Sequence, residues 1–383
     1  MNTETFQRML YSTVLPSSLP SSNQNYEELM AYVRSIIPKK LFRFRRCKGR
    51  HVDDFYNDKF GVATGIHMND GFDTRLFFDR ASAEKWIESF LNTLTDSKAV
   101  ESLRGLSPIA NPSRSLDRNI NDVIRSIPNM PTEFIVAKMK EVQNQLQTDL
   151  ETATQLFAEA TQRTVQFASL CASVKSATMW GHYAADETGF ALEYDFTAGA
   201  ENICQSCPKK VDACHFNKLY RVFPIIYGTE RYRVSNAFIQ YLLQGEVLAA
   251  ASKNSADPEL KAFFASCSQT VPCPDLLEPT KIALHKSLDW SYEEEWRVFF
   301  SLDFPYPRDI QYDHFYKKPT ALYLGRRIDP TDRKNLLDIA KEKGLPVYQM
   351  TLNDSSATYE LIAAPVTSQN ETSEIDVKTA EPN

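Results

Sequence analysis

Three consecutive glutamates at positions 293–295, in the segment SLDWSYEEEWRVFF, are the strongest candidates for acid–base chemistry in this sequence. If the segment is a strand, Glu293 and Glu295 lie on the same face, because side chains alternate between the two faces of a strand. One carboxylate of such a pair can react while its neighbour adjusts its position or proton affinity. The alternative is a solvated acidic edge in which Arg297 is a local ion-pair partner.

A second candidate site is the aromatic segment MWGHYA, in which Trp180, His182 and Tyr183 combine flat rings with polar groups. Rings and hydrogen-bonding groups at this density suit the stacking of a planar ligand. The same residues also fit a corner of the core in which His182 is bonded to a backbone carbonyl. The pattern alone leaves both interpretations open.

A third candidate is basic, since seven Lys or Arg residues occur within positions 39–50, KKLFRFRRCKGR. Arg43 and Arg45 alternate with Phe42 and Phe44, which predicts a short strand. An inward-facing arginine of this strand could hold a phosphate with two N–H donors. The whole segment could instead bind nucleic acid, or be a strand edge protected by its charge.

The candidate metal ligands are Cys204, Cys207, Cys214 and His215. The Cys-x-x-Cys spacing suits tetrahedral coordination, but the adjacent Cys214 and His215 cannot easily both bind one ion. We therefore expect no metal cofactor. The sequence also lacks a Walker phosphate loop and the GxGxxG, HExxH and GxSxG motifs, which argues against several common nucleotide-binding and hydrolase folds.

Composition restricts the class of protein without naming an activity. The 383 residues are 43% hydrophobic and 24% charged, with a net charge of −6, as in a globular protein. The sequence contains no run of about 18 apolar residues that would predict a membrane span, and its start lacks the features of a signal peptide. Seven cysteines at irregular spacing do not indicate a disulfide framework, so the cytoplasm is the expected location.

The distribution of residue types predicts one α+β domain over residues 38–365, preceded by a loose arm and a helix at 1–37. Hydrophobic residues recur every three or four positions within 81–163, which predicts a helical insertion or lobe. Residues 366–383 lack aromatic residues, so we expect a disordered tail. Besides 41–45, strands are expected at 60–66, 165–173, 189–196, 219–228, 294–304 and 321–328, and helices at 231–251 and 278–288.

Taken in order, these segments resemble a bacterial family known only as domain of unknown function twenty-nine seventy-one. Its motifs LYKYR, NDPFD, MWxHYA, GFxxEYD and YExEWR correspond here to Leu41–Arg45, Asn69–Asp73, Met179–Ala184, Gly189–Asp195 and Tyr292–Arg297. The resemblance spans residues 38–362. Two departures are Gly71 in place of the family's proline, and Ala63 and Thr64 in place of its paired serines.

The order of an arginine strand, a hydroxyl residue and a late Glu-x-Glu also resembles the layout of ADP-ribosyltransferases. That layout implies a mixed or antiparallel split sheet, with NAD as the substrate. In those enzymes an arginine holds the NAD diphosphate or ribose, and a hydroxyl side chain positions the nicotinamide half. The second glutamate stabilises an oxocarbenium-like transition state, because cleavage builds positive charge on the ribose.

The resemblance implies a role for each candidate residue here. Arg45, with Arg43 beside it, would hold the phosphate or ribose, and Thr64 or Ser169 would supply the hydroxyl. Glu295 would be catalytic with Glu293 assisting. The remaining expected binding residues are Trp180, His182, Tyr183 and Arg297.

The expected function is therefore that of a bacterial toxin or phage-defence protein that transfers ADP-ribose from NAD to an unknown protein or nucleic acid. One alternative is a non-enzymatic module that senses a nucleotide through MWGHYA and contacts a partner through the block 81–163. Another is a nucleic-acid effector that uses the basic segment 39–50.

Overall fold

The computed structural model describes residues 3–16, 24–79, 165–197, 221–239, 273–299 and 314–367, together with 241–242 and a few separate residues between 81 and 163. The predicted helical insertion at 81–163 and the predicted tail at 366–383 lie largely outside the described residues. The candidate metal ligands from Cys204 to His215 lie entirely outside them.

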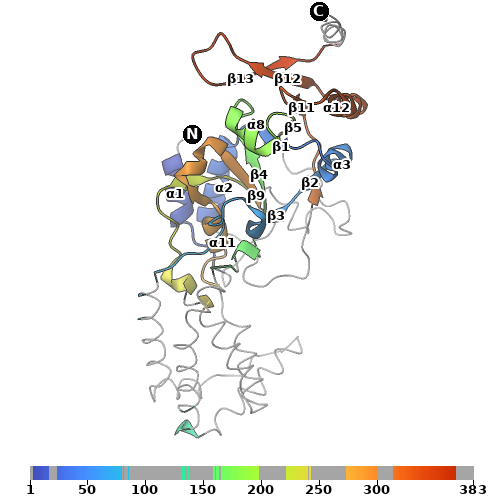
Figure 1. Cartoon of the computed structure of the whole chain (residues 1–383). Coiled ribbons are helices and arrows are strands. Elements are labelled where there is room, and N and C mark those ends of the chain that lie inside the picture. Colours follow the sequence, from blue (N-terminus) through green and yellow to red (C-terminus); the bar gives the residue numbers. More distant parts are fainter. Residues whose placement is uncertain are drawn as a thin grey trace, which may run out of the picture.

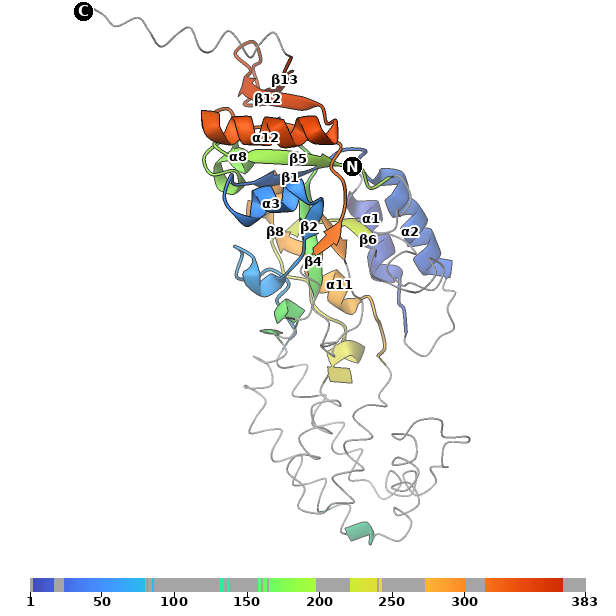
Figure 2. The same ribbon diagram turned by 90° about the vertical axis from the view of Figure 1, so that its right-hand side faces the viewer.

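A mixed sheet of nine strands forms the centre of the described part of the chain (Figures 1 and 2). Its order is β13-β12-β11-β5-β1-β4-β9-β6, with β3 also paired to β4. Neighbours in this sheet are antiparallel except β11 and β12, which are parallel. The strands are β1 (Leu41–Arg45), β3 (Ala63–Thr64), β4 (Gln166–Cys171), β5 (Phe190–Tyr194), β6 (Arg221–Pro224), β9 (Glu295–Phe299), β11 (Ala321–Leu324), β12 (Val347–Leu352) and β13 (Leu361–Pro365).

Short strand pairs and helices surround this sheet. The pairs are β2 (Lys59–Gly61) with β10 (His314–Tyr316), and β7 (Ile226–Gly228) with β8 (His285–Ser287). The helices are α1 (Thr3–Ser12), α2 (Gln24–Ile36), α3 (Arg50–Tyr56), α8 (Ala177–Tyr183), α11 (Glu278–Ala283) and α12 (Pro330–Lys343), with 3-10 turns η1 (Gly65–His67) and η4 (Leu288–Glu293). The predicted α+β class with a mixed, mainly antiparallel sheet is confirmed.

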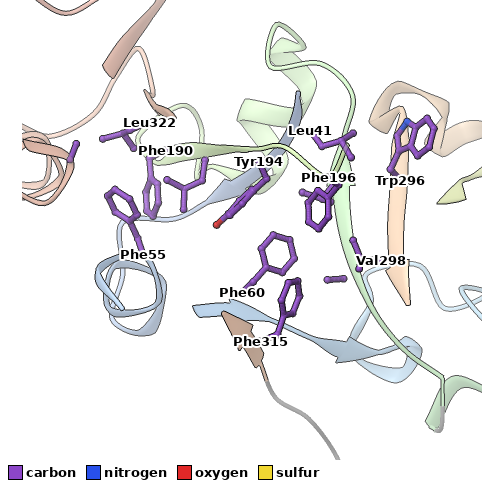
Figure 3. Close-up of a cluster of buried hydrophobic side chains, with 14 of the residues drawn as sticks. Leu41, Phe55, Phe60, Phe190, Tyr194, Phe196, Trp296, Val298, Phe315 and Leu322 are labelled. Carbon is purple, nitrogen blue, oxygen red and sulfur yellow. The ribbon is translucent and has the colours of Figure 1, made fainter. Parts of the chain in front are cut away.

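The two faces of the sheet carry separate hydrophobic clusters, because alternate residues of β1 point to opposite sides. Leu41 packs with Phe55 of α3 and with residues of α12 in one cluster (Figure 3). Phe42 and Phe44 pack with Trp180 of α8 in another. Arg43 and Arg45 therefore share the face of Leu41.

The prediction of a loose arm at the N-terminus is wrong for residues 3–12, which form α1. Phe6 and Leu10 are four positions apart, so they lie on one face of a helix, and both are completely buried. They pack in one cluster with Leu29 and Val33 of α2 and with Phe167 of β4. The Ser- and Asn-rich stretch that suggested an arm begins only after this helix.

Candidate functional site

The central sheet is split between β1 and β4. The two strands pair at a single position in the described structure, Phe42 with Cys171. Further along the same edge of β4, β3 pairs with Phe167 and Gln166. The stretch of β4 edge between these pairs, at Ser169, therefore faces no neighbouring strand among the described residues.

A pocket of about 390 Å³ opens at this split. Four consecutive residues of β1 (42–45) and five of β4 (167–171) line it. The other lining residues are His51, Ala63, His67, Met68, Asn69, Met179, Tyr183, Lys286, Glu293 and Glu295. Candidate residues from the basic, aromatic and acidic segments thus line one pocket, although they are far apart in the sequence.

The two glutamates reach the pocket through an irregular backbone. Glu293 ends η4, Glu294 has a left-handed backbone with φ of 43°, and Glu295 begins β9. The prediction that a single strand aligns Glu293 and Glu295 is therefore wrong. Both are nevertheless buried, at 4% and 5% exposure, while Glu294 is exposed. Their carboxylates meet at Lys286 Nζ, with distances of 2.5 and 3.3 Å.

These residues belong to a buried charge cluster formed by Asp73, Lys286, Glu293, Glu295 and Arg297. Arg297 Nε donates to Glu295 Oε1 at 2.7 Å, and its two Nη groups donate to Asp73 at 2.6 and 2.8 Å. Three carboxylates face two cations in this group. The cluster therefore has a net negative charge when every member is ionised.

The two glutamates have opposite shifts of their pKa values. Burial raises the pKa of Glu295, but the charges of Arg297 and Lys286 outweigh burial and lower it to about 2. Burial also raises the pKa of Glu293, and there the charge of Lys286 compensates only in part. Neighbouring carboxyl groups whose pKa values are pushed apart can take different roles, one permanently ionised and one exchanging a proton.

Tyr183 connects this acidic group to the surface of the pocket. Its hydroxyl donates to Glu293 Oε1, and it accepts an N–H bond of 2.7 Å from Asn69 Nδ2. Burial and the charge of Glu293 raise the pKa of Tyr183, so its hydroxyl stays protonated at neutral pH.

Arg43 and Arg45 line the pocket from β1. Arg43 Cζ lies 4.1 Å from the centroid of the Phe60 ring, and its Nη2 donates to the Gly61 carbonyl at 2.6 Å. Its Nε and Nη1 have no hydrogen-bond partner in the described structure. Arg45 Nη1 donates to the Phe44 carbonyl at 3.1 Å, and burial lowers the pKa of Arg45 to about 10.

The other candidate residues lie around the pocket without lining it. Thr64 is buried in β3. Trp180 is completely buried and its Nε1 donates to the Val174 carbonyl at 2.7 Å, which is a core position. His182 is exposed, and its Nδ1 lies 3.0 Å from the Tyr292 hydroxyl. Of the polar MWGHYA residues, it is Tyr183 that reaches the pocket.

Three residues of the site had no role in the sequence-based prediction: Asn69, Asp73 and Lys286. Asn69 and Asp73 bracket the segment that corresponds to the family motif NDPFD. Their polar types and their place in a motif are a signal that could have identified them. Their partners could not be predicted, because Asp73 meets Arg297 across 224 positions of sequence.

The fold and the pocket define an α+β protein with a polar cleft between two strands of one sheet. Residues 179–298 match the family described as "Protein of unknown function (DUF2971)", which confirms the resemblance indicated by the motifs. The matched segment contains Tyr183, Lys286, Glu293, Glu295 and Arg297. No curated protein and no solved structure matches this chain.

The described residues include no group of three or more His, Cys, Asp or Glu side chains arranged to hold a metal ion. Among the same residues, no helix combines the length and apolar character needed to cross a bilayer.

Proposed function

We propose that the pocket binds NAD, cleaves its nicotinamide–ribose bond and transfers ADP-ribose to an acceptor. The observation that carries the proposal is the separation of charge along the pocket. Arg43 and Arg45 line it from β1, whereas Glu293 and Glu295 line it from the far side of β4. NAD has the complementary arrangement, with an anionic diphosphate and a cationic nicotinamide ribosyl group.

Glu295 suits the stabilisation of positive charge on the ribose. Its low pKa keeps it ionised, and its bonds to Arg297 fix the direction of the carboxylate. A fixed carboxylate needs little reorganisation when charge develops in the transition state. In this proposal Glu295 is the stabilising group, and the net negative charge of the buried cluster adds to its effect.

Arg45 is well placed to bind the diphosphate of NAD. Burial removes water from its guanidinium and lowers its pKa to about 10, although the nearby charge of Asp54 opposes that shift. A desolvated cation gains more from an anionic ligand than an exposed one does. Arg43, with two unpartnered nitrogen atoms, supports the same end of the ligand.

A second candidate is a module that binds a nucleotide without cleaving it. The observation that favours this candidate is that both oxygens of Glu295 are occupied by Arg297, at 2.7 and 3.1 Å. The ion pair offsets much of the carboxylate charge that cleavage would need. A toxin or phage-defence role would follow for either candidate only from the identity of the acceptor or partner.

The decisive experiment is mass spectrometry of nicotinamide release from NAD by the purified chain, with and without cell lysate as a source of acceptors. Glu295→Gln should abolish release. Glu294→Gln is the matched control, because Glu294 is the adjacent carboxylate but is exposed. Circular dichroism and thermal unfolding of each variant separate loss of chemistry from loss of fold.

The outcomes distinguish the two candidates. Release by the wild type and by Glu294→Gln, but not by a folded Glu295→Gln, supports cleavage. If NAD raises the unfolding temperature but is never consumed, the binding module is correct instead. Arg45→Gln should then lose the thermal shift, since Arg45 belongs to the ligand pocket and not to the acidic cluster.

A further inference from the structure

A chain of hydrogen bonds runs through the wall of the pocket. Asn69 Nδ2 donates to the Tyr183 hydroxyl at 2.7 Å, and that hydroxyl donates to Glu293 Oε1. The second oxygen of Glu293 accepts a 2.5 Å bond from Lys286 Nζ. All four residues line the pocket, although they come from three separate segments of the chain.

This chain of hydrogen bonds leads from solvent into the interior of the protein. Asn69 is exposed and Tyr183 is partly buried, whereas Glu293 and Lys286 are 4% and 7% exposed. The Tyr183 hydroxyl is therefore the link between an exposed amide and a buried carboxylate of the pocket lining.

The two glutamates differ in the kind of group that they bind. Both oxygens of Glu295 are held by the guanidinium of Arg297, which never gives up its protons at physiological pH. Glu293 Oε1 instead accepts a phenolic hydroxyl, whose proton can move along the hydrogen bond. Glu293 is thus the carboxylate of this pocket that is connected to a mobile proton.

We propose that Tyr183 and Glu293 form a relay that takes the proton of the attacking nucleophile, so that the acceptor is a neutral protic group. A hydroxyl, an amide nitrogen or water belongs to this class, whereas a carboxylate needs no such relay. The inference rests on the proposed function and adds the chemical class of the second substrate. Asn69 is a positioning residue, because it fixes the orientation of the Tyr183 hydroxyl.

The step conserves atoms and charge. The nucleophile bonds to the ribose carbon as the carbon–nitrogen bond breaks, and the electron pair of that bond leaves with nicotinamide, which becomes neutral. The proton of the nucleophile passes to the Tyr183 oxygen while the tyrosine's own proton passes to Glu293 Oε1. Glu293 later returns the proton to solvent, and no oxidant or reductant takes part.

The test uses Tyr183→Phe with water as the nucleophile, measured as nicotinamide release from NAD. We expect kcat to fall about a hundredfold or more, within the range for general base catalysis, with little change in KM for NAD. Sodium azide should then restore release and yield ADP-ribosyl azide, because azide is an anion that requires no deprotonation.

The matched control is Tyr323→Phe. Tyr323 also donates to a buried carboxylate, Glu193 Oε2 at 2.6 Å, but it does not line the pocket. This variant should keep the wild-type rate with or without azide. If Tyr183→Phe fails to fold, Asn69→Ala takes its place, since Asn69 is exposed, and it should show a smaller loss that azide also relieves.

Each outcome decides one question. Wild-type turnover by Tyr183→Phe, or a loss that azide does not relieve, overturns the relay while leaving NAD cleavage intact. If the wild type releases no nicotinamide from NAD under any condition, the proposed function itself fails, and the relay fails with it.

Discussion

Arg297 and Asp73 are joined in the interior by two N–H···O bonds of 2.6 and 2.8 Å, although 224 positions separate them in the sequence. Both side chains are completely buried. The bonds tie the loop that carries Asn69 to the strand that carries Glu295. Two parts of the pocket lining are therefore held in place by one guanidinium.

Removing that guanidinium should destabilise the fold strongly. Arg297→Met leaves Asp73 and Glu295 buried without their main partner, which typically costs about 3–5 kcal/mol. Arg326→Met is the control, since Arg326 forms its 2.6 Å bond to Glu187 at the surface and should contribute less than about 1 kcal/mol. Urea unfolding of the two variants measures both values, and equal losses would contradict a special role for the buried pair.

Glu295 should make the free energy of unfolding decrease as the pH falls below 4.5. Its pKa is about 2 in the fold and 4.5 for an unperturbed glutamate, so its contribution is complete above pH 4.5 and is lost as the pH falls toward 2. The check is the urea midpoint of the wild type and of Glu295→Gln between pH 3 and 6. The difference between them should shrink with acid, and a constant difference would refute the assignment.

The contribution of Glu293 to stability should change with pH in the opposite direction. Its pKa is raised in the fold, so its carboxylate opposes folding as the pH rises above 4.5. Glu293→Gln should therefore gain stability relative to the wild type as the pH increases from 4 to 7. The same urea measurements test this expectation, and a relative loss over that range would show that the partners of Glu293 outweigh its burial.

Ser169 should contribute to NAD binding but little to the free energy of unfolding. Its hydroxyl is buried at the split of the sheet, makes no hydrogen bond of ordinary geometry in the described structure, and helps to lower the pKa of the neighbouring Glu295. Ser169→Ala should change the unfolding free energy by about 1 kcal/mol or less, because only a weak interaction with Glu295 is lost. The NAD-induced rise in unfolding temperature should decrease in the same variant, and calorimetry with and without NAD measures both effects.

Gly189 should be intolerant of a side chain. A Cβ atom there would lie 2.2 Å from the Arg45 carbonyl oxygen and 2.8 Å from that of Ala184, and both are backbone atoms. Gly189→Ala should lower the unfolding temperature and weaken NAD binding, because it displaces Arg45. Gly181→Ala is the control, since nothing lies within 4 Å of a Cβ in that helix, and it should be neutral or stabilising by up to about 1 kcal/mol.

The sequence predicted the elements whose pattern is local. Alternation in LFRFR identified β1, and the helix expected within residues 1–37 is present as α2. The Glu293 and Glu295 pair was predicted from strand alternation, but the left-handed residue Glu294 interrupts the strand. Residues that favour a left-handed backbone are usually glycine or asparagine, so nothing in EEEWR indicated the kink.

The charge cluster could be predicted only in part. Arg297 as a partner of the acidic run was one of the two interpretations, and its bond to Glu295 is present, although in the interior and not at a solvated edge. The contributions of Asp73 and Lys286 depend on how β4, β8 and β9 are arranged. Such long-range contacts leave no local pattern in a single sequence.

The single pair of residues that joins β1 to β4 has a mechanical consequence. On either side of that joint the ladders have five paired positions, β1 with β5 and β4 with β9. A force applied across the sheet would therefore act mainly on the single pair of Phe42 and Cys171, and the sheet would separate between β1 and β4, where the pocket lies. A ligand that contacts both strands would add a second connection there and raise the force needed to unfold the protein.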